Sequence, residues 1–171
     1  MRPDWDIFCN VIDNYGDIGI AWRLARGLAR DHGGNVRLWV DDLAAFRRIW
    51  PAVETRAHAQ RCEGVTVRRW AAPFEPVQPA RRVVEAFGCA LPDVYLAAMA
   101  IQEPPPVWIN LEYLSAEPWV SAHHGLPSPH PQLPLTKYFF FPGYVPETGG
   151  LLVETDYFAR RSGFDADAYW R

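Results

Sequence analysis

Two aspartates near the start of the chain, Asp13 and Asp17, stand in a polar turn that interrupts an apolar run. A helical pattern follows the turn directly. In open α/β sheets the turn between a strand and the next helix faces the ligand crevice. Asp13 and Asp17 are therefore candidates for chemistry, and we expect both at the carboxyl end of the first strand with their side chains toward an open cleft.

The glycines of this turn could bind an anion. Gly16 and Gly19 stand where the helical pattern begins, and a helix N-terminus offers backbone N–H groups to a group such as a diphosphate. The signal is weak, because neither the dinucleotide fingerprint nor the phosphate-loop motif is present in the turn. Taken by themselves, the aspartates fit structural roles better, with Asp17 as a helix N-cap and Asp13 as a turn residue.

A second polar segment follows an apolar strand predicted over Val107–Leu111. Glu112 and Glu117 flank Tyr113 and Ser115 in this segment, again at the carboxyl end of a strand. A binding role and a role as a helix cap or solvated turn are equally compatible with the sequence. Both alternatives stay open at this level.

The sequence assigns no metal site and no disulfide. Three histidines lie in or beside a proline-rich stretch without acids or cysteines at a ligand spacing, which favours solvated loop side chains: His123, His124 and His130. The three cysteines are widely spaced and lack a C-x-x-C motif: Cys9, Cys62 and Cys89. Buried reduced thiols are the favoured interpretation.

Composition predicts one globular domain. The chain has 171 residues and is 49% hydrophobic, with 8 Trp, 9 Phe and 7 Tyr, which excludes a disordered chain. A net charge of −3 gives no electrostatic footprint for nucleic acid. No signal peptide opens the sequence, and no apolar stretch reaches the ~20 residues of a membrane span. We therefore expect a cytoplasmic protein that binds neither nucleic acid nor membrane.

Strand and helix patterns alternate along the chain, which predicts an α/β fold with a parallel sheet. Strands are expected at Trp5–Ile12, Asn35–Val40, Val65–Trp70, Arg81–Gly88, Val107–Leu111 and Thr136–Phe141. Helices are expected at Ile18–His32, Leu43–Ile49 and Val94–Ile101, and the first has Ile20, Leu24 and Leu28 on one apolar stripe. The segment Arg81–Gly88 is ambiguous between strand and helix, and the turn that follows it favours a strand. Asp41 and Asp42 stand in N-cap position for the second helix, and Gly125–Leu135 is expected to be a loop.

Long runs of sequence, spread over almost the whole chain, match the pattern of one known family. They lie at Asp6–Cys9, Val11–Gly19, Trp22–Arg26, Val36–Leu43, Glu85–Cys89, Trp108–Glu117, His124–Ser128, Lys137–Gly143 and Gly149–Leu152. These runs closely resemble the EarP family of bacterial protein-arginine rhamnosyltransferases, which modify translation elongation factor P.

The resemblance implies an inverting glycosyltransferase of GT-B architecture, built from two Rossmann-like domains. It implies dTDP-β-L-rhamnose as donor and an arginine side chain of elongation factor P as acceptor, with no cofactor and no metal. Family members are about twice as long as this chain. The resemblance therefore assigns residues 1–158 to the acceptor-side N-terminal domain and residues 159–171 to the start of a link toward a C-terminal donor domain. The chain alone is expected to fold but to be inactive.

The resemblance also implies roles for single residues. Asp13 and Asp17 fall on the essential catalytic pair of the family, while Asn14, Gly16 and Gly19 fall on the donor-facing loop. The acceptor-binding residues would be Glu112, Tyr113, Ser115 and Glu117. A guanidinium has a pKa above ~12 and delocalised lone pairs, so carboxylates must orient it and withdraw a proton. We assign Asp17 as general base and Asp13 as the orienting group, and the reverse assignment stays open.

Two other function classes compete with this assignment. The first is a non-catalytic Rossmann-like module that only binds a protein or a nucleotide. The second is a nucleotide-dependent oxidoreductase, which the missing glycine fingerprint disfavours. A second α/β domain encoded downstream of Arg171 would distinguish the transferase from the binding module.

Overall fold

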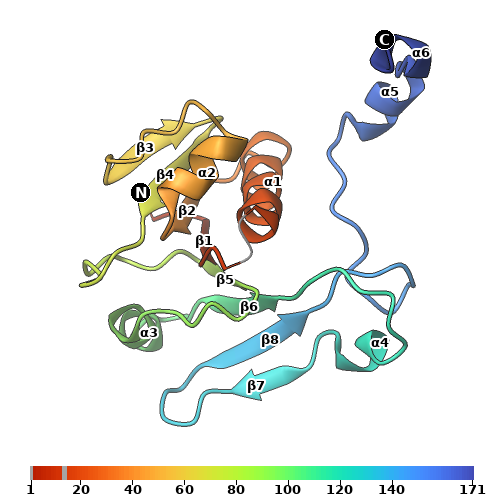
Figure 1. Ribbon diagram of the computed structural model, residues 1–171. Helices are drawn as coiled ribbons and strands as arrows, with labels where there is room; N and C mark the ends of the chain where they lie inside the picture. The colour runs from red at the N-terminus through yellow and green to blue at the C-terminus, as the bar shows by residue number, and fades with distance from the viewer. Residues whose placement is uncertain (1, 13–14) are drawn as a thin grey trace.

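The computed structural model describes residues 2–12 and 15–171, and one eight-stranded sheet forms its centre (Figure 1). The strands are β1 (Trp5–Cys9), β2 (Val36–Val40), β3 (Ala59–Cys62), β4 (Val65–Arg69), β5 (Arg82–Ala86), β6 (Val107–Leu111), β7 (Pro127–Pro129) and β8 (Thr136–Phe140). The helices are α1 (Gly16–Arg30), α2 (Leu43–Ile49), α3 (Asp93–Ala100), α4 (Val120–His123), α5 (Tyr157–Ser162) and α6 (Ala166–Tyr169).

The strand order is β3-β4-β2-β1-β5-β6-β8-β7. The inner strands from β4 to β8 all pair in parallel, whereas β3 and β7 are antiparallel additions at the two edges. Numbered along the chain, the parallel strands have the order 3-2-1-4-5-6 of a doubly wound Rossmann sheet. The order reverses between β1 and β5, and a ligand crevice is expected at the carboxyl ends of these two strands. The predicted α/β Rossmann-like class is confirmed.

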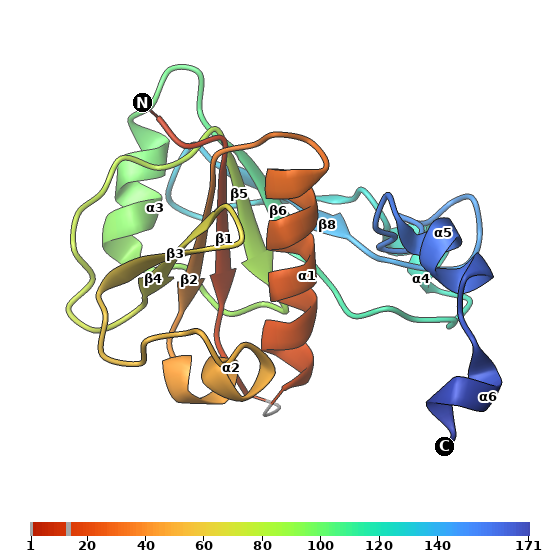
Figure 2. The same ribbon diagram turned by 90° about the horizontal axis from the view of Figure 1, so that it is seen from above.

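Helices cover both faces of the sheet. Helices α1 and α2 lie on one face and α3 lies on the other, as Figures 1 and 2 show together. Successive side chains of a strand point to opposite faces, and β1 follows this rule. Ile7 and Cys9 belong to the cluster under α1 and α2, whereas Phe8 belongs to the cluster under α3. All three are fully buried, so β1 is covered on both faces of the sheet.

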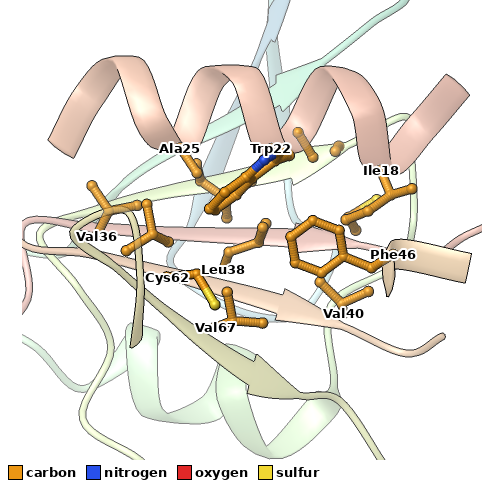
Figure 3. Packing of buried hydrophobic residues seen from close by; sticks show 14 of the residues in the cluster. Ile18, Trp22, Ala25, Val36, Leu38, Val40, Phe46, Cys62 and Val67 are labelled. Carbon is orange, nitrogen blue, oxygen red and sulfur yellow. The ribbon is translucent and has the colours of Figure 1, made fainter. Parts of the chain in front are cut away.

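The buried stripe of α1 differs from the predicted one. We expected Ile20, Leu24 and Leu28 to face the core, yet these side chains are only partly buried at its margin. The buried apolar residues are Ile18, Ala21, Trp22 and Ala25, which have the i, i+3, i+4, i+7 spacing of one helix face. Figure 3 shows this face against Leu38 of β2 and Phe46 of α2. The small alanines let α1 approach the sheet closely, and the large Trp22 fills the space toward α2.

Most predicted elements are present, with shifted ends. The first strand stops at Cys9 and not at Ile12, and the first helix spans Gly16–Arg30 and not Ile18–His32. The ambiguous segment is a strand, β5, and the predicted strand at Val107–Leu111 is confirmed residue for residue. Asp42 caps α2, because its Oδ1 accepts from the backbone N–H groups of Ala44 and Ala45 at 2.8 and 2.9 Å.

Five short elements were not predicted: β3, α4, β7, α5 and α6. Strand β7 lies inside the stretch Gly125–Leu135 that was expected to be a loop, so that prediction is wrong for Pro127–Pro129. Proline cannot donate to a central ladder but is tolerated in an edge strand, which is where β7 lies. Elements of three to six residues carry too little periodicity to be recognised from sequence.

The C-terminal segment leaves the body of the protein. Every residue from 155 to 171 is exposed, and α5 and α6 extend away from the sheet in Figures 1 and 2. The predicted domain limit at residue 158 falls inside α5, and that limit stays a prediction. Among the described residues, no helix has the length and apolar character needed to span a membrane.

Candidate functional site

Asp17 is the second residue of α1 and lies at the carboxyl end of β1. Among the described residues, the backbone N–H of Ile12 donates to its Oδ2 at 3.1 Å and the Tyr113 hydroxyl donates to its Oδ1 at 2.7 Å. The N-cap interpretation of Asp17 is wrong, because Tyr15 occupies that position; the Tyr15 side chain makes no capping hydrogen bond. Asp17 instead closes the turn between β1 and α1 from inside the helix.

Asp17 is buried, contrary to the expectation that its side chain is exposed in a cleft. Only 1% of the residue is exposed, so the prediction of a side chain facing an open cleft is wrong for this aspartate. The expected edge of the sheet is nevertheless correct. The bond from Tyr113 brings the segment after β6 to the turn after β1, across a separation of 96 residues.

Other predicted residues of the turn can be placed only in part. Asp13 and Asn14 lie outside the described residues. Gly16 is the exposed first residue of α1. Gly19 faces α2, where a Cβ atom would meet Ile49 Cδ1 at 3.7 Å, an ordinary contact. Packing therefore does not require glycine at position 19, and the donor-loop role of Asn14, Gly16 and Gly19 stays a prediction.

The turn is held by an aspartate for which no site role was predicted. Asp41, directly after β2, accepts from the backbone N–H groups of Val11 and Asp42 through Oδ1 at 2.9 and 2.8 Å. It thereby ties the end of β1 to the end of β2. The crevice rule could have identified it, because Asp41 also follows a parallel strand at the same edge. It was considered only as a helix cap.

Tyr113 spans the point where the strand order reverses. Its ring stacks on Phe87, with ring centroids 4.2 Å apart and planes 12° from parallel, while its hydroxyl donates to Asp17. Phe87 directly follows β5 and has a left-handed backbone, with φ of 58°. Its N–H donates to Leu111 O at 2.7 Å. Residues after β1, β5 and β6 therefore meet in one contact chain. Nothing in the sequence pattern distinguished Phe87.

Glu112 lies at the same edge of the sheet. No hydrogen bond among the described residues joins it to Asp17. Its backbone N–H donates to Phe140 O, and its Oε1 accepts from the buried Asn110 Nδ2 at 2.5 Å. The side chain lines an open groove of about 270 Å³ between α1 and the chain after β8. Apolar groups form most of its wall: Ile20, Leu114, Pro142, Leu151 and Leu152, with Arg23 and Tyr144 at its margin.

Ser115 and Glu117 belong to a neighbouring groove. Ser115 Oγ accepts from the backbone N–H of Glu117 at 3.1 Å, which is a local turn contact. Both residues line a hollow of about 290 Å³, and Tyr144 lines this hollow as well as the groove beside Glu112. Three of the four predicted acceptor residues thus line two adjacent grooves, whereas Tyr113 is directed to Asp17.

The histidines have structural contacts and are not simply solvated. His124 Nδ1 accepts from Phe141 N at 3.1 Å, and His130 Nδ1 accepts from Leu133 N at 3.0 Å. His123 Nδ1 lies 2.8 Å from Trp119 O. Among the described residues, no three His, Cys, Asp or Glu side chains are grouped so that they could hold a metal ion.

Two thiols lie close to the site but are poor nucleophiles. Burial raises the pKa of Cys9, at the end of β1, well above its ordinary range, and the nearby Cys89 and Asp17 add to this effect. Burial likewise raises the pKa of Cys89 to about 12, with a further contribution from Glu85. All three cysteines are free and buried, as predicted. The carboxylates therefore remain the candidates for proton transfer.

Comparison with known proteins gives one family. The family model described as "Elongation-Factor P (EF-P) rhamnosyltransferase EarP" matches residues 5–171. A protein-arginine rhamnosyltransferase of Pseudomonas putida is 55% identical over 168 residues, 98% of this chain and 44% of the relative. Its counterpart in Pseudomonas aeruginosa is 53% identical over 162 residues, 95% and 43% of the two chains.

A more distant relative extends the match. The protein-arginine rhamnosyltransferase of Shewanella oneidensis is 46% identical over 169 residues, which cover 95% of this chain and 42% of the relative. The chain thus spans less than half the length of the curated relatives it matches. Because the family model covers nearly all of the chain and the relatives agree, the protein belongs to the EarP family.

Proposed function

We propose that the chain is the N-terminal domain of an inverting GT-B glycosyltransferase that transfers L-rhamnose from dTDP-β-L-rhamnose to an arginine of elongation factor P. Membership of the EarP family supports this proposal. One contact within the site also supports the proposal. The 2.7 Å hydrogen bond between Tyr113 and Asp17 joins the segment proposed for catalysis to the segment proposed for the acceptor.

Asp17 is the proposed general base. A guanidinium nitrogen attacks the anomeric carbon of rhamnose, the C–O bond to the diphosphate breaks, and its electron pair leaves with dTDP. The attacking nitrogen gives its proton to the Asp17 carboxylate, so that the product arginine keeps its positive charge. A single displacement inverts the anomeric configuration. Asp13 orients the guanidinium in this scheme, as a carboxylate can through two parallel charge-assisted hydrogen bonds.

The groove beside Glu112 is the proposed path of the acceptor arginine. Its apolar wall suits the methylene stem of an arginine, which packs well on such surfaces while its head stays polar. The Glu112 carboxylate in this wall supplies a countercharge for the guanidinium. Glu117 and Ser115, in the adjacent hollow, are proposed to contact the polypeptide around that arginine.

The remaining length of the relatives leaves room for a donor domain. We propose that residues 159–171 begin the link to it, because every residue of this segment is exposed, including the aromatic Phe164 and Trp170, at 59% and 82%. The 171 residues alone are then inactive, because the donor must be held and water excluded by a second domain. A translation factor as acceptor implies that the reaction occurs in the cytoplasm.

The test uses the full-length product of the gene and, in parallel, residues 1–171. Each is incubated with elongation factor P and dTDP-β-L-rhamnose, and intact-mass spectrometry detects the addition of one deoxyhexose. An elongation factor P variant with lysine at the acceptor position is the control. The proposal is supported if the full-length protein adds a deoxyhexose to elongation factor P with arginine at the acceptor position and not to the lysine variant. Binding of elongation factor P without transfer by the full-length protein would favour the non-catalytic module.

A further inference from the structure

The two carboxylate oxygens of Asp17 accept from donors of different kinds. Oδ2 is bonded to a backbone N–H, that of Ile12, whereas Oδ1 is bonded to the hydroxyl of a long side chain, that of Tyr113. Asp17 is 1% exposed and Tyr113 is 49% exposed. The hydrogen bond to Oδ1 therefore links a buried carboxylate to a half-exposed side chain.

The ring of Tyr113 stacks on the ring of Phe87. The two rings are nearly parallel at 4.2 Å between centroids, and a stacked aromatic pair is favourable by about 0.5–1.5 kcal/mol beyond its buried area. Phe87 holds a left-handed φ of 58°, which is costly for a bulky residue and needs support from its surroundings. The bond from Phe87 N–H to Leu111 O at 2.7 Å supplies part of that support.

We infer that Tyr113 is a positioning residue that orients the Asp17 carboxylate for proton acceptance, with Phe87 holding the tyrosine ring in place. This inference rests on the proposed function, because it specifies how the proposed base is held. The tyrosine hydroxyl donates to Oδ1 of Asp17, so Tyr113→Phe removes this donor without removing the ring. Loss of Phe87 has the opposite pattern: the hydroxyl remains, but the ring that carries it loses its platform.

Both variants are expected to act on kcat. A hydrogen bond to a charged group is worth enough that Tyr113→Phe should lower kcat by about 10- to 100-fold in the full-length enzyme. The KM for elongation factor P should change by less than about threefold, because an interaction that matters only in the transition state leaves KM unchanged. Phe87→Leu should also lower kcat. Phe87→Tyr keeps an aromatic ring beneath Tyr113 and should therefore have the kcat of the parent enzyme.

A double variant separates positioning from direct contact with substrate. If Tyr113 acts through Asp17, adding Tyr113→Phe to Asp17→Asn causes no further loss of turnover. Tyr138→Phe is the matched control, because Tyr138 is a half-exposed tyrosine of β8 outside the site, and its loss should leave kcat and KM unchanged. Circular dichroism and a thermal melt establish that each variant is folded.

Each outcome decides between the two proposals. An active parent whose Tyr113→Phe and Phe87→Leu variants keep parental kcat overturns the positioning role and leaves the proposed function intact. A raised KM with unchanged kcat also overturns it, since Tyr113 would then be an acceptor contact. Additive losses in the double variant would show that Tyr113 acts independently of Asp17. A full-length parent that transfers no rhamnose overturns the proposed function itself.

Discussion

Asp6 and Arg37 are direct register partners on β1 and β2 and form a two-pronged ion pair, with Arg37 Nε 2.6 Å from Oδ1 and Nη2 2.5 Å from Oδ2. Asp6 is fully buried. The same carboxylate accepts from Trp39 Nε1, Tyr95 Oη and Ala80 N, at 3.0, 2.5 and 2.8 Å. One charged group thus ties two strands, a helix and the chain before β5. Burial beside this carboxylate also raises the pKa of Tyr95 far above its ordinary range.

The first prediction follows from this pair. Asp6→Asn turns an acceptor-only group into one that presents an N–H₂ to other donors, and it leaves Arg37 largely buried without its counterion. Breaking a buried pair in this way costs about 3–5 kcal/mol of unfolding free energy. Urea unfolding of residues 1–171 measures the loss.

Glu75→Gln is the matched control for Asp6→Asn. Glu75 forms an exposed ion pair with Arg68, at 3.9 Å and with 77% of the Glu75 side chain exposed. Such surface pairs contribute little, so we expect a change of less than about 1 kcal/mol. Equal losses for the two variants would show that Asp6 does not hold the sheet together.

The second prediction concerns the two aspartates of the turn in the full-length protein. Asp17→Asn keeps the shape of the side chain but removes the base, and loss of a general base typically lowers turnover by about 10²–10⁴-fold. Asp13→Asn should lower turnover and also weaken binding of elongation factor P, because a charge-assisted contact becomes neutral. Steady-state kinetics and calorimetric binding to elongation factor P distinguish the two effects. Near-parental turnover of Asp17→Asn would refute the assignment of the base.

The third prediction concerns the buried thiols. In the folded state Cys9 and Cys89 have raised pKa values, about 12 for Cys89 compared with an ordinary 9.0, because burial disfavours the thiolate. We expect Ellman's reagent at pH 8 to leave both unmodified in the folded protein and to modify them after unfolding in guanidinium. Because burial raises the folded-state pKa of Cys89, the protonated thiol contributes to the free energy of unfolding. This contribution is complete below pH 9.0 and is lost as the pH rises toward about 12. Rapid labelling of protein with an unchanged circular dichroism spectrum would contradict the prediction.

The fourth prediction concerns the ion pair between α1 and the chain after β8. Arg23 Nε donates to Glu154 Oε1 at 2.8 Å, and this hydrogen bond lowers the pKa of Glu154 to about 2 from its ordinary 4.5. A lowered pKa contributes stability above pH 4.5 that is lost as the pH falls toward about 2. Arg23→Gln should return the pKa of Glu154 toward 4.5, as measured by carbon-detected NMR titration. Arg26→Gln is the control, because Arg26 packs over the rings of Trp22 and Trp50. A Glu154 pKa unchanged by Arg23→Gln would contradict the prediction.

Local patterns in the sequence were enough to predict most of the fold. Apolar runs with turn residues at their ends correctly located β2, β6 and the other parallel strands, because burial on both faces of such a sheet leaves a readable signature. Asp42 was recognised as a candidate cap since a cap depends only on residues within one helical turn. The turn with Asp17 was located at the correct edge for the same reason: its position depends on the strand before it and the helix after it.

The tertiary structure alone decided which groups meet at that edge. Periodicity does not encode sheet order, so the contact of Tyr113 with Asp17, the platform of Phe87 and the anchoring of the turn by Asp41 could not be derived from spacing. The burial of Asp17 depends in part on the same long-range contact, because Tyr113 lies 96 residues away in the sequence. Local chemistry thus located the turn, and long-range hydrogen bonding across the strand reversal determined how its carboxylate is held.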